Sequence, residues 1–161
     1  MSAAKKTNAM RLLDSAQIDY AVRTYEFDED DLSGVHAADA IGMAREAVFK
    51  TLVARGDKTG FAVFCIPVAE SLDLKKAARA SGNKAVELLH VKELLPVTGY
   101  IRGGCSPVGM KKMYRTTFHE TAKEQPVIMV SGGKIGTQVS CAPEDLRRIT
   151  DGQYADVCKE A

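Results

Sequence analysis

The sequence predicts an α+β fold, in which helices surround a curved sheet of mixed strand directions. Segments that alternate like strands outnumber helical segments, hairpin turns join some of the strands, and helical segments separate the others. The composition, with 45% hydrophobic and 27% charged residues, is that of an ordinary globular protein. A chain of 161 residues can bury one complete core, so we expect a single domain over residues 1–161.

Capping residues and apolar spacing define the elements of the first third of the chain. Thr7 and Ser33 each stand where a side-chain oxygen can cap a following helix. The stretch "DYAVRTYEF" puts Tyr20, Val22 and Thr24 on one face, which is typical of a half-buried strand. The predicted elements are a helix over 8–17, a strand over 19–27, an acidic solvated loop over 28–31 and a short helix over 33–43.

The middle of the chain predicts a hairpin followed by two helices. Two apolar runs in residues 47–68 flank a turn at Gly56–Gly60, which indicates paired antiparallel strands. A helix over 71–82 would stop at Gly82, because glycine readily takes the left-handed conformation that ends helices. A shorter helix over 90–99 would be ended by Pro96 and Gly99.

The C-terminal part predicts three more strands, a helix and a last strand. The runs "TTFHE", "QPVIMVSGG" and "GTQVSCAP" indicate strands, and a glycine loop over 131–136 would join the last two. Pro143 opens a helix with acidic residues in its first turn and arginines toward its end, as the helix dipole favours. The stretch "YADVC", residues 154–158, predicts the final strand.

Charge and cysteine usage exclude several classes of protein. The net charge of +1 provides no extended basic surface, so any contact with nucleic acid would have to be local. No signal peptide and no apolar stretch of membrane-spanning length is visible, so we expect a soluble, cytoplasmic protein with no membrane partner. The four cysteines form no CxxC pair and none has a histidine at ligand spacing, so we expect no metal site; Cys65 and Cys141 resemble core residues.

Two glycine-rich stretches carry a functional signal. "GYIRGGCSPVGMKK", residues 99–112, and "VSGGKIGT", residues 130–137, both present backbone N–H groups with little side-chain obstruction. Such loops can closely approach a phosphate, a ribose hydroxyl or a developing oxyanion. Neither stretch has the spacing of a P-loop or of the GxGxxG dinucleotide fingerprint. Tight turns with no ligand are the alternative.

Lys50 is the other unusual residue, because it stands between Phe49 and Leu52 at the start of an apolar strand. Lysine is rarely buried without a partner or a task, so Lys50 is a candidate cation for an anionic or carbonyl oxygen. An edge-strand lysine whose ammonium reaches water is the alternative. The three histidines form no triad with a serine or cysteine motif, and Ser106 has no evident base.

Three ordered motifs, "FKTLV", "GYIRGGCSPVGMKK" and "VSGGKIGTQVSCAPEDL", resemble the YbaK/EbsC family. That family is the free-standing relative of the editing domain of bacterial prolyl-tRNA synthetases. The resemblance extends from Thr7 to about Ile149 and implies a YbaK-like fold, an α+β pseudo-barrel with surrounding helices. The first glycine loop resembles the branch that hydrolyses cysteine mischarged on proline tRNA.

The resemblance also implies a set of site residues. Lys50 matches the strand lysine of the family, and with the backbone amides of Gly103 and Gly104 it is implied to be catalytic. The implied substrate-binding residues are Tyr20, Tyr100, Cys105, Ser106, Pro107, Ser131, Gly132, Gly133 and Gly136. The chain departs from the family at Ile135, where a basic residue is common, and so lacks one phosphate contact.

The implied activity is hydrolysis of Cys-tRNA(Pro) to cysteine and tRNA(Pro), without a metal or an organic cofactor. The thiol of the substrate cysteine would attack its own carbonyl, which explains the lack of a triad and excludes alanine and serine chemically. Cys105 would then be a wall of the pocket, not the nucleophile. Recognition of the mischarged tRNA(Pro) acceptor end, with help from Lys111 and Lys112, would be completed by a transient complex with prolyl-tRNA synthetase; a merely solvated lysine pair is the alternative.

Two competing functions remain open at this point. One is a deacylase for Ala-tRNA(Pro) or another small aminoacyl-tRNA, which the identity of the cleaved ester would distinguish. The other is a non-catalytic adaptor that binds tRNA ends or a synthetase, which would tolerate loss of Lys50.

Overall fold

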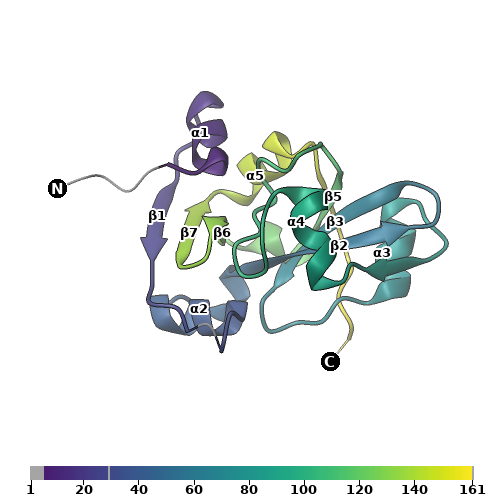
Figure 1. Ribbon diagram of the computed structural model, residues 1–161, viewed down its shortest axis with the longest axis horizontal. Helices are drawn as coiled ribbons and strands as arrows, with labels where there is room; N and C mark the ends of the chain where they lie inside the picture. Colours follow the sequence, from purple (N-terminus) through teal and green to yellow (C-terminus); the bar gives the residue numbers. More distant parts are fainter. Residues whose placement is uncertain (1–5, 29, 161) are drawn as a thin grey trace.

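The computed structural model describes residues 6–28 and 30–160 (Figure 1). Over these residues it contains five α-helices and eight strands, which confirms the predicted α+β fold. The strands form two sheets instead of one curved sheet, with the orders β4-β2-β3-β5-β8 and β1-β7-β6. None of the helices in the described part of the chain is long and apolar enough to cross a membrane.

The five-stranded sheet is built around the predicted hairpin. β2 and β3 pair antiparallel along their whole length, from Phe49↔Pro67 to Gly56↔Gly60, while β5 runs parallel to β3. The short β4 was missed because three residues carry too little alternation to signal a strand. The strands of this sheet are β2 (Phe49–Gly56), β3 (Gly60–Pro67), β4 (Val86–Leu88), β5 (Arg115–His119) and β8 (Gln153–Ala155).

The three-stranded sheet is antiparallel throughout and consists of β1 (Ala21–Thr24), β6 (Ile128–Lys134) and β7 (Thr137–Cys141). All four residues of β1 are exposed, so the prediction of a half-buried strand was wrong. β1 is an edge strand that pairs only with β7, and hydrogen bonding to one neighbour does not require burial of a side-chain face.

The two sheets meet at the start of β2 and share a core. A parallel bridge pairs Val48 with Met129 of β6, and both side chains are buried. One continuous cluster of buried side chains includes Cys65 and Phe118 from the large sheet and Cys141 from the small one. Cys65 and Cys141 are therefore buried in the core, as predicted.

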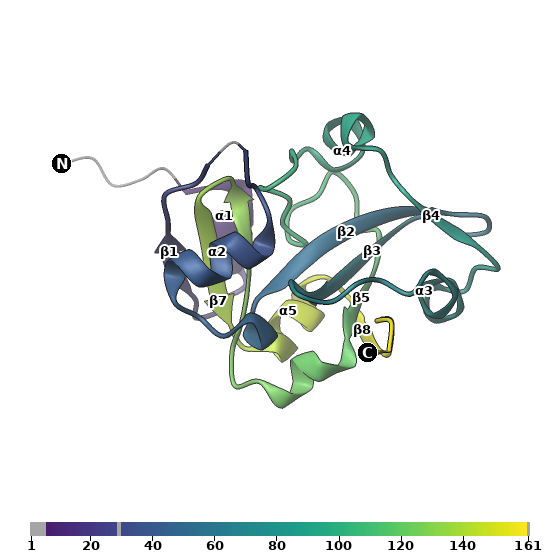
Figure 2. The same cartoon turned by 90° about the horizontal axis from the view of Figure 1, so that it is seen from below.

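The helices lie on the outside of the sheets (Figures 1 and 2). Thr7 Oγ1 accepts a hydrogen bond from the Met10 N–H at 3.2 Å, and Ser33 Oγ accepts one from the His36 N–H at 3.1 Å, which confirms both predicted caps. The helices are α1 (Asn8–Ser15), α2 (Gly34–Ile41), α3 (Leu74–Ser81), α4 (Val91–Thr98) and α5 (Pro143–Ile149), with 3₁₀ turns at Arg45–Ala47 and Glu120–Glu124.

Several predicted boundaries were wrong. Pro96 lies inside α4 and does not end it; Gly99 does, with φ +88° and its N–H donating to the Leu95 carbonyl at 2.8 Å. α1 ends at Ser15 because Gln17 has a φ of 57°. The last strand spans Gln153–Ala155 instead of 154–158, and Cys158 forms only an isolated bridge with Leu72.

The second glycine-rich stretch is also not the loop that was predicted. Ser131, Gly132 and Gly133 belong to β6, and only Ile135 and Gly136 form the turn to β7. The pairing between β6 and β7 slips between Ser131 and Lys134, next to Gly133 with its φ of +106°. Glycine permits this irregular ladder, since most side chains are strained at positive φ.

Candidate active site

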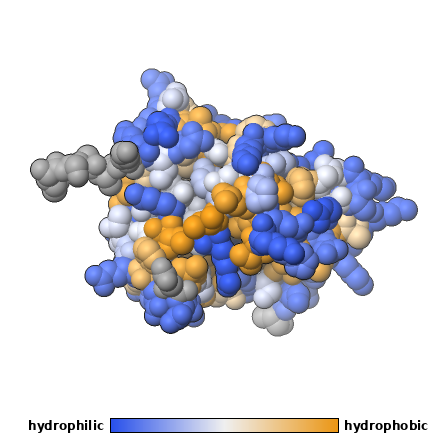
Figure 3. Space-filling view, viewed as in Figure 1, coloured by the Kyte–Doolittle hydropathy of each residue, from blue (hydrophilic) through white to orange (hydrophobic). Residues whose placement is uncertain are grey.

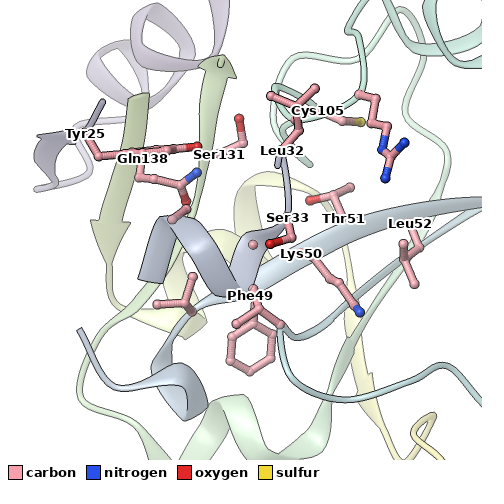
Figure 4. Close-up of a pocket in the computed structure, with 16 residues that line it drawn as sticks. Tyr25, Leu32, Ser33, Phe49, Lys50, Thr51, Leu52, Cys105, Ser131 and Gln138 are labelled. Carbon is pink, nitrogen blue, oxygen red and sulfur yellow. The ribbon is translucent and has the colours of Figure 1, made fainter. Parts of the chain in front are cut away.

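A cavity of about 300 Å³ opens where the two sheets meet (Figure 4). Its wall combines the start of β2, the first turn of α2, part of the first glycine loop, and one residue each from β6 and β7. The lining residues are Tyr25, Leu32, Ser33, Gly34, Ala37, Val48, Phe49, Lys50, Thr51, Leu52, Val68, Arg102, Gly103, Cys105, Ser131 and Gln138.

Close packing of α2 against the sheet brings the helix start to the cavity. A Cβ placed on Gly34 would lie 2.4 Å from Val68 Cγ1 and 3.8 Å from Lys50 Cβ. Only glycine therefore lets the first turn of α2 rest directly on Val68, just after β3, beside Lys50 of β2. The Ser33 cap fixes where that helix begins.

Lys50 lines the cavity, as the sequence indicated. β2 is an inner strand, but β4 pairs only with Ala54–Gly56, so at Lys50 the strand has β3 on one side alone. The side chain is half-buried, and Figure 4 shows its ammonium directed away from Ser131 and Gln138, toward the side of Leu52.

The electrostatic surroundings of Lys50 include the Glu70 carboxylate but no ion pair among the described residues. Burial lowers the pKa of Lys50, while Cys158 and Glu70 act in the opposite direction. Burial raises the pKa of the Cys158 thiol to about 12, so that thiol is neutral at pH 7 and supplies no counter-charge. Among the described residues no carboxylate lies within 4.0 Å of Lys50. Such a lysine can hold an anion that enters the cavity.

The first glycine loop contributes Arg102, Gly103 and Cys105 to the wall. In the described chain the backbone N–H groups of Gly103 and Cys105 donate no hydrogen bond. The Gly104 N–H, in contrast, donates to the Ile101 carbonyl at 2.9 Å, and Gly104 does not line the cavity. Of the two glycines expected to supply amides, only Gly103 lines the cavity.

Gly104 instead fixes the position of the loop. A Cβ at this residue would lie 3.0 Å from backbone atoms of Lys134, the last residue of β6, and of Ile135 in the turn that follows. Ile135, the departure from the family pattern, packs behind the loop, since its Cγ1 would lie 3.4 Å from a Cβ at Gly103. The two glycine-rich stretches thus pack against each other.

Tyr100, Ser106 and Pro107 do not line the cavity. The Tyr100 hydroxyl donates to the Val108 carbonyl at 2.6 Å, and the fully buried Ser106 accepts a hydrogen bond from the Val108 N–H at 3.2 Å. These bonds hold the loop in shape. Ser106 is not on the cavity wall, where a nucleophile would have to act. Pro107 lies with Lys111 and Lys112 on a different hollow.

Of the second stretch, Ser131 alone faces the cavity, and its hydroxyl accepts a hydrogen bond from the Gly133 N–H at 3.2 Å. The three glycines expected to bind substrate instead permit close packing. A Cβ at Gly132 would meet Met10 and Thr137, one at Gly133 would meet Thr7 and Tyr100, and one at Gly136 would meet Phe27.

Tyr20 is separated from the cavity, because its hydroxyl donates to Asp14 of α1 at 3.0 Å. Cys105 does line the cavity, as expected for a wall residue. Burial raises the pKa of its thiol to about 12, so this side chain is a neutral thiol at pH 7 and a poor nucleophile.

Comparison with known families agrees with this arrangement. The family model for the aminoacyl-tRNA editing domain matches residues 33–149, which include Lys50 and both glycine-rich stretches. The chain belongs to the aminoacyl-tRNA editing domain family. Editing is hydrolysis of the ester between an amino acid and tRNA, so this editing domain is an enzyme, an aminoacyl-tRNA deacylase.

Similar proteins match this chain over nearly its whole length. EbsC of Enterococcus faecalis, named as a candidate Cys-tRNA(Pro)/Cys-tRNA(Cys) deacylase, is 48% identical over 153 residues, covering 95% of this chain and 93% of its own. A solved structure described as a candidate trans-editing enzyme for prolyl-tRNA synthetase has a TM-score of 0.81 at 24% identity and covers 98% and 100% of the two chains. The hypothetical protein APE2540 has a TM-score of 0.85 at 20% identity and covers 95% and 100%. The two structures show the same fold.

The cavity wall also includes residues that sequence reasoning missed. Tyr25, Thr51, Arg102 and Gln138 line the cavity but were not among the predicted site residues. Arg102 alone carried a signal, since it directly precedes the glycine pair. The others become neighbours only through the packing of β2, β7 and the segment that directly follows β1.

Of the residues that the structure describes, the cavity wall contains two cations, Lys50 and Arg102, and no acidic residue. Together with the free amides of Gly103 and Cys105, this arrangement can bind a phosphate and donate hydrogen bonds to a carbonyl or oxyanion. Within residues 6–28 and 30–160, no three His, Cys, Asp or Glu side chains are grouped to hold a metal ion.

Proposed function

We propose that this protein hydrolyses cysteine from mischarged tRNA(Pro) and that Lys50 is central to the reaction. The observation that carries the proposal is a half-buried lysine that forms no ion pair within the described chain and shares the cavity wall with Gly103 and Cys105, whose backbone N–H groups donate no hydrogen bond there. The identity of 48% with EbsC, which is named for cysteinyl-tRNA, supports cysteine as the amino acid. We further propose one editing domain over residues 1–161, acting in the cytoplasm.

In this proposal Lys50 binds the terminal phosphate of the tRNA or polarises the ester carbonyl. The amides of Gly103 and Cys105 donate to the oxyanion that forms on the carbonyl oxygen, each contributing about 3–4 kcal/mol in comparable sites. Ser131 and Gln138 hold the ribose and the amino acid from the opposite wall. Tyr100, Ser106, Gly104, Gly132, Gly133 and Gly136 shape the site without touching the substrate, and Pro107 and Tyr20 lie outside it.

The nucleophile we propose is the thiol of the substrate. Its thiolate attacks the ester carbonyl carbon, a C–S bond forms, and the C–O bond to the tRNA breaks as the 3′-oxygen takes up a proton. Water then opens the resulting thiolactone to cysteine. Alanine has no such group, whereas pocket size alone separates amino acids of this size by only about 1–3 kcal/mol.

Recognition of the tRNA body is not explained by this domain alone, since its net charge is +1. We propose that a transient complex with prolyl-tRNA synthetase supplies the specificity for tRNA(Pro). Addition of the synthetase should then raise kcat/KM for Cys-tRNA(Pro) more than for cysteine on another tRNA.

The role of Lys50 predicts a pH dependence. The charged form is the active one, and burial lowers its pKa below the ordinary value of 10.5. Activity should therefore rise as the substrate thiol ionises and fall again as Lys50 loses its proton, with the alkaline midpoint below 10.5. The measurement is kcat/KM from pH 6 to pH 10, corrected for spontaneous ester hydrolysis.

The control is Lys50→Arg, because a guanidinium keeps its charge over this range. The alkaline decline should disappear in whatever activity that variant retains. An unchanged decline in Lys50→Arg would assign it to another group and contradict the proposed role.

A further inference from the structure

A second hollow of about 600 Å³ adjoins the cavity and shares Lys50 and Leu52 with it. It lies beside the start of α3, between that helix and β4, and Lys159 also lines it. Because Lys50 lines both spaces and its ammonium is directed away from Ser131, any group bound by Lys50 stands at the boundary between them (Figure 4).

The rim of this hollow carries an excess of positive charge. Lys50, Lys75 and Lys159 form no ion pair with any described residue, in contrast to Lys76, which contacts Asp156 at 2.9 Å. Asp73 also lines the hollow, but its carboxylate is engaged as the cap of α3, where it accepts a hydrogen bond from the Lys76 N–H at 3.0 Å.

The floor of the hollow is apolar. Leu52, Leu74 and Leu88 line it, and the last two are 45% and 41% exposed. Figure 3 shows hydrophobic side chains gathered across the middle of the face that is seen in Figure 1, with hydrophilic residues among them. An apolar floor with lysines at its rim suits a nucleotide, whose base has an apolar face and whose phosphates are anionic.

We propose that this hollow binds the nucleotide that precedes the terminal adenosine of the tRNA. The proposal rests on the proposed function, since it places the terminal adenosine and its amino acid in the cavity. The phosphate that joins the two nucleotides then lies at Lys50, the preceding base rests on the leucines, and Lys75 and Lys159 hold the next phosphates. The single strand enters beside α3.

This path differs from the one expected at Lys111 and Lys112. These residues line another hollow that shares no residue with the cavity, and the Lys111 ammonium already donates to the Pro96 carbonyl at 3.1 Å. Among the hollows described, only the one at α3 shares Lys50 with the cavity.

The test compares two substrates, Cys-tRNA(Pro) and the cysteinyl ester of adenosine, which lacks the preceding nucleotide. In Lys75→Ala/Lys159→Ala, the ratio of kcat/KM for the tRNA to that for the short ester should fall about tenfold, through KM for the tRNA. The slope of log kcat/KM against log salt concentration should lessen by about 1.4, because about 0.7 is lost with each single-strand phosphate contact.

Two further variants complete the design. Lys58→Ala/Lys84→Ala, which removes two exposed lysines outside both hollows, should match wild type on both substrates. An unchanged ratio in Lys75→Ala/Lys159→Ala, or a tenfold fall in Lys111→Ala/Lys112→Ala instead, would overturn the proposed path. If wild type cleaves neither substrate, it is the proposed function that fails.

Discussion

Replacing Lys50 with alanine is expected to lower kcat/KM for Cys-tRNA(Pro) by about 100- to 1,000-fold, the usual effect of removing one electrostatic contact to a transition state. No carboxylate among the described residues lies within 4.0 Å of Lys50, and the only other cation on the cavity wall is Arg102. The substrate phosphate or oxyanion would therefore lose its nearest compensating charge in a partly buried site.

Stability measurements separate this effect from misfolding. Lys50 forms no ion pair with any residue that the structure describes, so Lys50→Ala should unfold at a denaturant concentration close to that of wild type. The matched control is Lys58→Ala, at an exposed lysine in the turn between β2 and β3, which should keep full activity. A loss of less than about threefold in Lys50→Ala would remove the lysine from the chemistry.

Gly104→Ala should lower the free energy of unfolding by about 2 kcal/mol, a typical cost of overpacking. Its Cβ would stand 3.0 Å from backbone atoms of Lys134 and Ile135, which cannot rotate away as a side chain can. The loop must shift, and the amides of Gly103 and Cys105 shift with it. Denaturant unfolding and deacylation assays should therefore both report a loss, although Gly104 lies outside the cavity.

Gly60→Ala is the control for glycine substitution as such. Gly60 has a φ of +78° and no atom within 4 Å of an added Cβ, so only backbone strain of about 1 kcal/mol applies. It lies in the far turn of the hairpin and should keep wild-type activity. Equal activity in Gly104→Ala and Gly60→Ala would show that contact with the β6–β7 turn does not position the loop.

Local signals predicted much of the fold. The caps Thr7 and Ser33, the stop at Gly82 and the hairpin around Gly56–Gly60 are set by neighbours in sequence, and all are present. Lys50 could be identified because a charge inside an apolar strand is unusual. The exposure of β1 could not be foreseen, because a strand's alternation does not reveal whether a second layer covers it.

The composition of the site was harder to predict, because it depends on packing between distant segments. A glycine signals either access for a ligand or close packing, and the sequence does not distinguish the two. Gly104, Gly132, Gly133 and Gly136 proved to permit packing. Gln138 and Thr51 carried no signal, since each is an ordinary strand residue until the two sheets bring them to one cavity.

The most direct test of the account is deacylation of Cys-tRNA(Pro), with Ser-tRNA(Pro) and Ala-tRNA(Pro) alongside, by the wild-type protein. Serine differs from cysteine only in having oxygen in place of sulfur, so it isolates the thiol from size. The account predicts rapid release of cysteine while the other two esters decay as in buffer. Release of alanine or serine at a comparable rate would contradict the substrate-thiol mechanism, and cleavage of no ester would contradict the proposed activity.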